Sequence, residues 1–178
     1  MNENIINDVF SVYEILKDSI KVTRRSINSN SSNSNSLKIY NQTLFLGEKR
    51  ELILEKIDNV ETELDDIMIL SLFASFEREL RISIQIIIDN NTNKINSLLI
   101  RTLSLVKDSI ERWTVPDMID SFKDVVSSDI RNKTKQIYEY RNWVAHGKNQ
   151  TKLPSIRTDP KTVKITLCDF IEQANTAF

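Results

Sequence analysis

The sequence predicts an all-α fold, and three observations support this prediction. Glycine and proline number only 2 and 3 in 178 residues, too few for the many turns of a multi-stranded sheet. Apolar residues recur at the three- and four-residue spacing of an amphipathic helix over most of the chain. No segment shows the pattern of a convincing strand. We therefore expect a helical bundle.

The first 45 residues are expected to form one helix and one loop. Residues 4–25 carry apolar side chains in a helical repeat. The segment SINSNSSNSNS, residues 26–36, is a low-complexity run that is typical of a flexible loop. We assign residues 1–45 to this additional N-terminal helix and loop, and residues 46–178 to a helical domain.

Two helices are expected in the next part of the chain. Residues 48–61 have apolar positions spaced for a helix, and residues 63–89 show the strongest helical pattern in the sequence. Glu77 falls inside the apolar face of the second helix, so its carboxylate must find a partner, become neutral or lie at an interface. The alternative is a residue at the helix edge that reaches solvent. A turn at Asn90 and Asn91 is expected to lead into a further helix.

The later helices are bounded by residues that commonly start or stop a helix. Pro116, Ser127 and Asp159 stand where three of them are expected to begin. Gly147 is expected to stop the helix that runs from Ile130 to His146.

The composition argues against several classes of protein. The single cysteine, Cys168, cannot form an intrachain disulfide, and no spacing of cysteine and histidine suggests zinc. We expect no signal peptide, because the N-terminus carries no basic start followed by an apolar run. The most apolar window is far shorter than the ~20 residues that cross a bilayer. We expect a cytoplasmic protein with no metal, no cofactor and no membrane partner.

Charge is unevenly distributed, although the net charge is −1. Nine basic and two acidic residues between Arg131 and Lys164 give this segment a charge of +7, which leaves −8 for the remainder. A basic segment attracts the phosphate backbone of a nucleic acid. The alternative is a solvated basic face that acidic neighbours balance.

The only histidine, His146, lies inside this basic segment. Asn142 precedes it by four residues, so the two share a helix face, whereas Arg141 lies about 140° away around a regular helix. Imidazole exchanges protons near neutral pH, arginine stabilises charge on a phosphoryl group, and asparagine can orient either one. Because RNA supplies its own 2′-hydroxyl nucleophile, these groups suffice for RNA cleavage. The alternative is a histidine that only complements the helix dipole.

Four charged residues are expected to support these three. The stem of Arg141 is expected to be partly buried, and Glu77 is similarly placed on its own helix, so we expect the two to form an ion pair. Lys135, Lys148 and Lys152 are the candidates for binding substrate phosphates.

Two segments resemble the HEPN superfamily. RNWVAH, residues 141–146, is similar to the Arg-φ-x3-His motif of its RNases, in which Asn, Asp or His often follows the arginine. LFASFEREL, residues 72–80, resembles the early core helix of several HEPN groups, including those linked to RiboL-PSP and abortive-infection systems. The resemblance covers about residues 62–178.

The resemblance implies a HEPN-like bundle that forms a homodimer, with the motif helices meeting around a composite active site. It implies a metal-independent endoribonuclease that leaves a 2′,3′-cyclic phosphate and acts in toxin–antitoxin pairs or phage defence. His146 would be the general acid/base, Arg141 would stabilise the phosphate or the transition state, and Asn142 would orient or bind. RNA and an antitoxin or defence-system protein are the implied partners. The alternative is a non-catalytic dimeric module or adaptor, because HEPN domains also serve that role.

Overall fold

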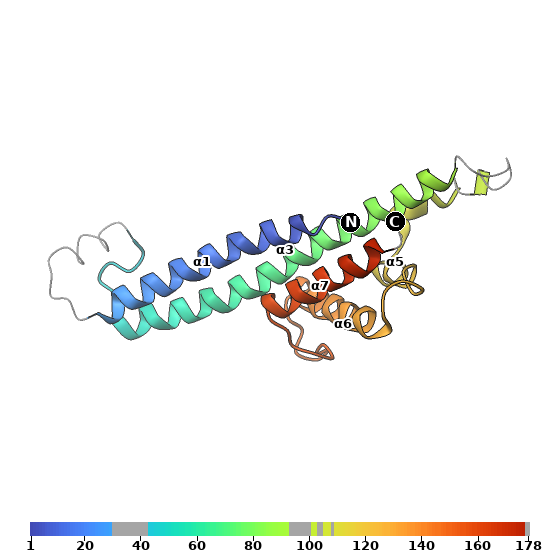
Figure 1. Cartoon of the computed structure of the whole chain (residues 1–178). Helices are drawn as coiled ribbons and strands as arrows, with labels where there is room; N and C mark the ends of the chain where they lie inside the picture. The colour runs from blue at the N-terminus through green and yellow to red at the C-terminus, as the bar shows by residue number, and fades with distance from the viewer. Residues whose placement is uncertain (30–42, 93–100, 103–104, 108, 177–178) are drawn as a thin grey trace.

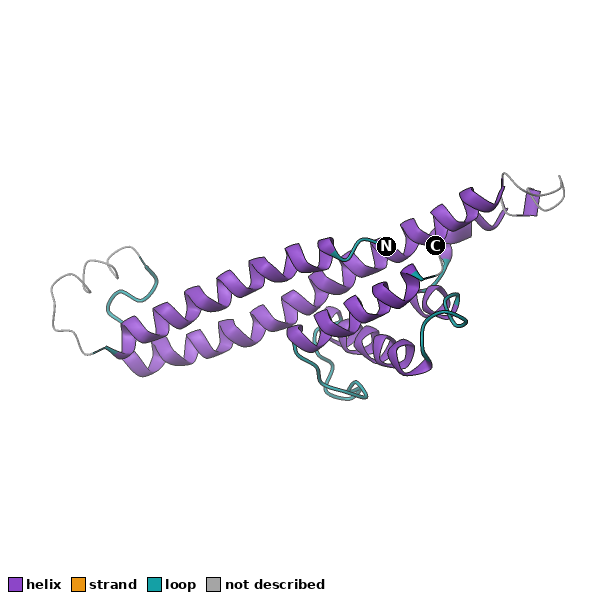
Figure 2. Ribbon diagram, in the orientation of Figure 1, coloured by secondary structure: helices purple, strands orange, loops and turns teal. Residues whose placement is uncertain are grey.

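The computed structural model describes residues 1–29, 43–92, 101–102, 105–107 and 109–176. These described residues form helices joined by turns and loops, with no strand, which confirms the all-α prediction (Figure 2). None of their helices is long and apolar enough to cross a membrane. The elements are α1 (Asn4–Asn28), α3 (Arg50–Thr92), the 3-10 helix η1 (Ile110–Arg112), α5 (Val115–Asp120), α6 (Ser128–Ala145) and α7 (Pro160–Asn175).

Helices α1 and α3 run side by side in opposite directions and form a long hairpin (Figure 1). The prediction of separate helices over residues 48–61 and 63–89 was wrong, because α3 is continuous across both. No glycine or proline interrupts the chain there, so nothing in the backbone stops the helix. The turn expected at Asn90 and Asn91 was also wrong, since α3 runs through both residues.

The low-complexity run near residue 30 is only partly a loop. Residues 26–28 form the last turn of α1, so the loop prediction was wrong for them. Serine and asparagine are weak helix formers but tolerable ones, and the preceding helix extends into the run. Residues 30–36 lie outside the described residues, as does much of the helix expected after residue 91.

The second half of α3 forms the centre of the core. Phe73 and Phe76 are fully buried. The Phe76 ring meets the Phe170 ring of α7 edge-on, with 5.1 Å between centroids, and the Phe73 ring lies 5.7 Å from the Tyr138 ring of α6. From α1, the cluster also takes in Ile6, Phe10 and Tyr13. One hydrophobic cluster therefore joins α1, α3, α5, α6 and α7.

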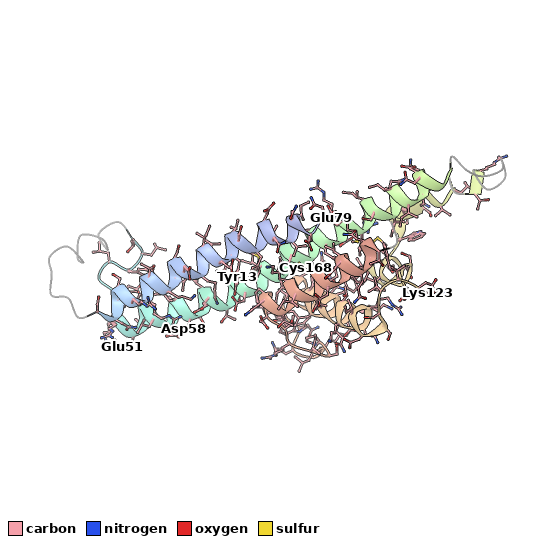
Figure 3. The ribbon with its side chains drawn as sticks, in the orientation of Figure 1. Tyr13, Glu51, Asp58, Glu79, Lys123 and Cys168 are labelled. Carbon is pink, nitrogen blue, oxygen red and sulfur yellow. The ribbon has the colours of Figure 1, made fainter. Side chains whose placement is uncertain are left out.

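Ion pairs hold α1 and α3 together where the hairpin extends beyond this core. The Lys17 Nζ atom lies 2.7 Å from a Glu61 oxygen and 3.0 Å from an Asp65 oxygen. The Arg24 guanidinium spans Asp58 and Glu61, with both contacts at 2.6 Å. Figure 3 labels Asp58 on this projecting part of the hairpin.

The expected capping residues stand at the expected helix starts. The Ser127 side chain accepts a hydrogen bond from the Ile130 N–H at the start of α6. The Asp159 side chain accepts hydrogen bonds from two backbone N–H groups at the start of α7. Thr114, before Pro116, forms a capping box that starts α5. The Ser127 and Asp159 caps fix where α6 and α7 begin, and the Asp159 cap also fixes where the loop between them ends.

Candidate functional site

Helix α6 presents His146 at its C-terminal end, as the sequence predicts. The helix ends in a Schellman motif, in which the Gly147 N–H donates to Val144 O at 3.0 Å and the Lys148 N–H donates to Trp143 O at 2.9 Å. Gly147 takes the left-handed conformation that this motif requires, with a φ of 79°. His146 is the C-cap residue and its side chain is exposed.

A pocket with a volume of about 500 Å³ lies beside this helix end. Asn142 and His146 both line it, which confirms that they share a face of α6. The other lining residues are Glu139, Trp143, Asn149, Lys152, Leu153 and Pro154. The pocket therefore combines a titratable imidazole, amide groups, one lysine and an apolar wall.

Arg141 does not line the pocket but contacts a residue that does. It is half-buried, as expected, and its Nη1 atom donates a hydrogen bond to Asn142 Oδ1 at 3.0 Å. Its Nε atom is buried and has no hydrogen-bond partner among the described residues. The contact with Asn142 links Arg141 to the face that carries His146, despite the wide angle between the two on a regular helix.

Trp143 was not among the predicted site residues, yet it shapes the pocket. Its Nε1 atom donates to Asn149 O at 2.8 Å, and its ring lies 5.7 Å from the Tyr140 ring. Glu139 also lines the pocket one turn before Asn142. Both residues follow from the three- and four-residue spacing that relates Asn142 to His146, so the helical repeat was a usable signal for them.

Lys148 is held by carboxylates of α3. Its Nζ atom lies 2.6 Å from a Glu63 oxygen and 2.7 Å from an Asp66 oxygen. Asp66 is buried and also accepts a hydrogen bond from the Tyr140 hydroxyl at 2.8 Å. The bonds to Asp66 and Glu63 raise the pKa of Lys148, while burial and the bond to Asp66 raise the pKa of Tyr140 to about 12. Lys148 therefore anchors the turn after His146 and does not line the pocket.

The other two predicted lysines differ in position. Lys152 lines the pocket. The Lys135 Nζ atom lies 2.7 Å from an Asp120 oxygen, and Arg131 shares the same carboxylate at 3.2 Å. The bond from Lys135 holds the pKa of Asp120 below its ordinary value. Of the three lysines, only Lys152 lines the same pocket as His146.

The expected ion pair between Glu77 and Arg141 does not form. Glu77 binds Arg81 one turn along α3, at 3.0 Å, and is half-buried at the helix edge. The C-terminal end of α6 meets α3 at Asp66, where Tyr140 binds, which is three helical turns before Glu77. Arg141 is therefore out of reach of the Glu77 carboxylate.

No cluster of three His, Cys, Asp or Glu side chains among the described residues is placed to hold a metal ion. The pocket itself offers one imidazole and one carboxylate, those of His146 and Glu139. The chain matches no protein-family model, no curated protein and no solved structure. The function of the site is therefore inferred from its residues and their contacts alone.

Proposed function

We propose that this chain is a metal-independent endoribonuclease of HEPN type that acts in a toxin–antitoxin pair or in phage defence, with His146 as the general acid/base. One observation carries the proposal: Asn142 and His146 line one pocket of about 500 Å³, and Arg141 bonds directly to Asn142 at 3.0 Å. The His146 imidazole and the Asn142 amide thus line the same pocket, and the Arg141 guanidinium contacts that amide directly. These groups suffice for cleavage next to a 2′-hydroxyl.

The chemistry uses the substrate's own nucleophile. The His146 imidazole takes the proton of the 2′-hydroxyl as its oxygen bonds to the adjacent phosphorus. The bond from phosphorus to the 5′-oxygen then breaks, and the departing oxygen takes up the proton that the His146 imidazolium returns as the general acid. The products are a 2′,3′-cyclic phosphate and a 5′-hydroxyl end, and no oxidant or reductant is involved.

Arg141 is the residue suited to stabilise the charge that builds up on the phosphoryl oxygens. Its Nη1 atom bonds to Asn142 and its Nε is buried, so Nη2 is the nitrogen left to donate to a phosphate oxygen. A hydrogen bond from a guanidinium to a phosphate oxygen is charge-assisted and therefore strong. Asn142 holds that group next to the face that carries His146.

The basic segment supports RNA as the partner even after its ion pairs are counted. Four of its nine basic residues pair with carboxylates: Arg131, Lys133, Lys135 and Lys148. The other five form no such pair within the described part of the chain: Arg141, Lys152, Arg157, Lys161 and Lys164. Positive charge that is not neutralised within the chain remains to attract a phosphate backbone.

Cleavage of a mixed tRNA and mRNA pool in EDTA tests the proposal. The purified wild type should produce cyclic-phosphate ends, and His146→Ala should lower the rate by about 100-fold or more, the usual contribution of a general acid/base. Asn132→Ala is the matched control, because Asn132 is an exposed α6 residue outside the pocket. His146 is itself exposed, so its replacement should leave the melting temperature unchanged. No cleavage by the wild type, or equal cleavage by His146→Ala, would contradict the proposal.

The second candidate function is a non-catalytic dimeric interaction module or adaptor. The observation that favours it is the row of exposed apolar side chains on the hairpin, which includes Val12, Leu16, Val60 and Ile67. Expression in cells separates the two candidates. An RNase toxin should arrest growth and His146→Ala should restore it, whereas an adaptor should be harmless in both forms.

A further inference from the structure

Helix α1 has one uncharged side along most of its length. All of its charged residues after the first ten lie within a sector of about 120° on a helical wheel. They are Glu14, Lys17, Asp18, Lys21, Arg24 and Arg25. The opposite side, between Val9 and Ile27, carries apolar residues, serine and threonine only. Val12 is 54% exposed and Leu16 is 43% exposed on this side.

Helix α3 continues this uncharged surface. Five apolar residues alternate at spacings of four and three, namely Ile53, Ile57, Val60, Leu64 and Ile67. Ile53 and Ile57 are buried, whereas Val60 is 57% exposed and Ile67 is 55% exposed. This spacing is typical of the apolar face along which one helix packs against others.

The apolar rows of the two helices lie on the same side of the hairpin. Ile20 and Thr23 of α1 line a shallow pocket together with Ile57 and Val60 of α3, and Phe45 and Lys56 complete its lining. The ion pairs of the hairpin use Lys17 and Arg24, which lie in the charged sector of α1. The hairpin therefore has one side closed by ion pairs and one side that presents apolar groups to solvent.

Helix α6 offers no comparable surface, although the resemblance places the subunit contact there. Its apolar side chains are buried or half-buried, apart from the small Ala145. The half-buried ones include Trp143 and Val144, which pack against the core of the same chain. The hairpin therefore offers more exposed apolar area for a subunit contact than α6 does.

We infer that the apolar side of the α1–α3 hairpin binds the same side of a second copy of this chain, forming a four-helix bundle between the two copies. This inference does not depend on the proposed enzymatic function. A second copy suits this geometry, because two identical two-helix hairpins that pack through the same side form a four-helix bundle. Val12, Leu16, Val60 and Ile67 become the core of that bundle.

The area of this side is sufficient for a stable dimer. The stretch from Val9 to Ile27 is about 27 Å long, and two neighbouring helices are about 20 Å wide. That gives about 540 Å² per copy and about 1,100 Å² for the pair, above the ~1,000 Å² expected of a biological interface. On this side of α1 no ionised group loses its water on contact, and Lys56 of α3 is the charged residue that lines the pocket there.

Light scattering on the full-length chain after size exclusion tests this inference. The wild type should have twice the 20.7 kDa mass of one chain. The double variant Leu16→Glu with Ile67→Glu should have the mass of one chain, because four carboxylates would meet in the interface. Both residues are exposed in the single chain and glutamate favours helices, so the monomer should keep its helical content by circular dichroism.

Two further variants identify the surface. Ile165→Glu is the matched control: Ile165 is 49% exposed on α7, which is not part of the hairpin, and its variant should remain a dimer. Ala145→Glu places a carboxylate on α6 and should also remain a dimer. A monomeric wild type would overturn the inference. So would a dimer that survives the double variant but dissociates with Ala145→Glu, since the contact would then be made through α6.

Discussion

At the scale of single residues, Lys148 has an unusual backbone conformation that its side chain offsets. Its φ is 57°, a left-handed value that costs a residue other than glycine about 1–2 kcal/mol. The contacts of its Nζ atom with Glu63 and Asp66, at 2.6 Å and 2.7 Å, hold the residue in that conformation. Because Lys148 follows Gly147 directly, these contacts also fix the turn that positions His146.

Asp66→Asn should therefore lower both stability and activity. The asparagine cannot form the ion pair, and it leaves Lys148 with Glu63 alone. We expect a loss of about 1–3 kcal/mol in the free energy of unfolding, the usual cost of breaking a buried charged hydrogen bond. RNA cleavage should fall as well, because the turn after His146 is released. Urea unfolding and the cleavage assay measure the two effects.

Asp129→Asn is the control for this prediction. Asp129 also pairs with a lysine, Lys133 at 2.8 Å, but its side chain is 70% exposed. A surface pair of this kind contributes little to stability. Equal losses in the two variants would show that the Asp66 contacts have no special role in holding the turn.

At the scale of secondary-structure elements, the sequence predicted where helices begin and end better than whether two helical segments are continuous. Ser127, Gly147 and Asp159 were recognisable because each satisfies backbone groups by itself, from a position that the local sequence fixes. The continuous α3 was predicted as two helices, over residues 48–61 and 63–89. No glycine or proline is present there to stop the helix.

The candidate site was predictable to the same extent. Asn142 and His146 are related by the repeat of one helix, so their shared pocket follows from the sequence. The contacts of Glu77, Lys135 and Lys148 depend on how separate helices cross and on how far each is shifted along its neighbour. A helical pattern fixes which face of a helix is buried, but it does not fix that shift.

The ion pairs between α1 and α3 should make the stability of the hairpin depend on pH. The bond from Lys17 holds the pKa of Glu61 below its ordinary value of 4.5. The carboxylate therefore stays ionised to a lower pH in the folded chain than in the unfolded chain. Its contribution to stability is complete above about pH 4.5 and is lost as the pH falls through the lowered pKa.

Thermal unfolding of the wild type and Glu61→Gln between pH 7 and pH 3 checks this dependence. The variant should melt at a lower temperature at pH 7, because it lacks both charged contacts. The two melting temperatures should converge at the acid end, where the wild-type carboxylate is protonated. Taking the difference between the two proteins removes the effect of other carboxylates. A difference that stays constant over the whole range would rule out this role of Glu61.

At the scale of the whole molecule, the core is concentrated at one end of the hairpin. Helices α6 and α7 lie beside the second half of α3, while its first half projects beyond them with α1 alone (Figure 1). The main hydrophobic cluster includes α3 residues from Met68 to Ile88. Ile53 and Ile57 are buried but lie outside that cluster. One continuous helix is thus supported by several layers at one end and by a single neighbour at the other.

Hydrogen exchange should therefore vary along α3 although its backbone hydrogen bonds are alike. In dilute protein, amides over residues 53–60 should exchange at least about tenfold faster than amides over residues 69–80, a difference of about 1.4 kcal/mol in the free energy of opening. Local opening near Ile53 exposes only the contacts with α1, whereas opening near Phe73 disrupts the shared core. Raising the protein concentration should slow exchange over residues 53–60 first, because the second copy would cover that part of the hairpin. Uniform rates along α3 would show that the projecting half is as firmly held as the core, and a gradient unaffected by concentration would count against the second copy.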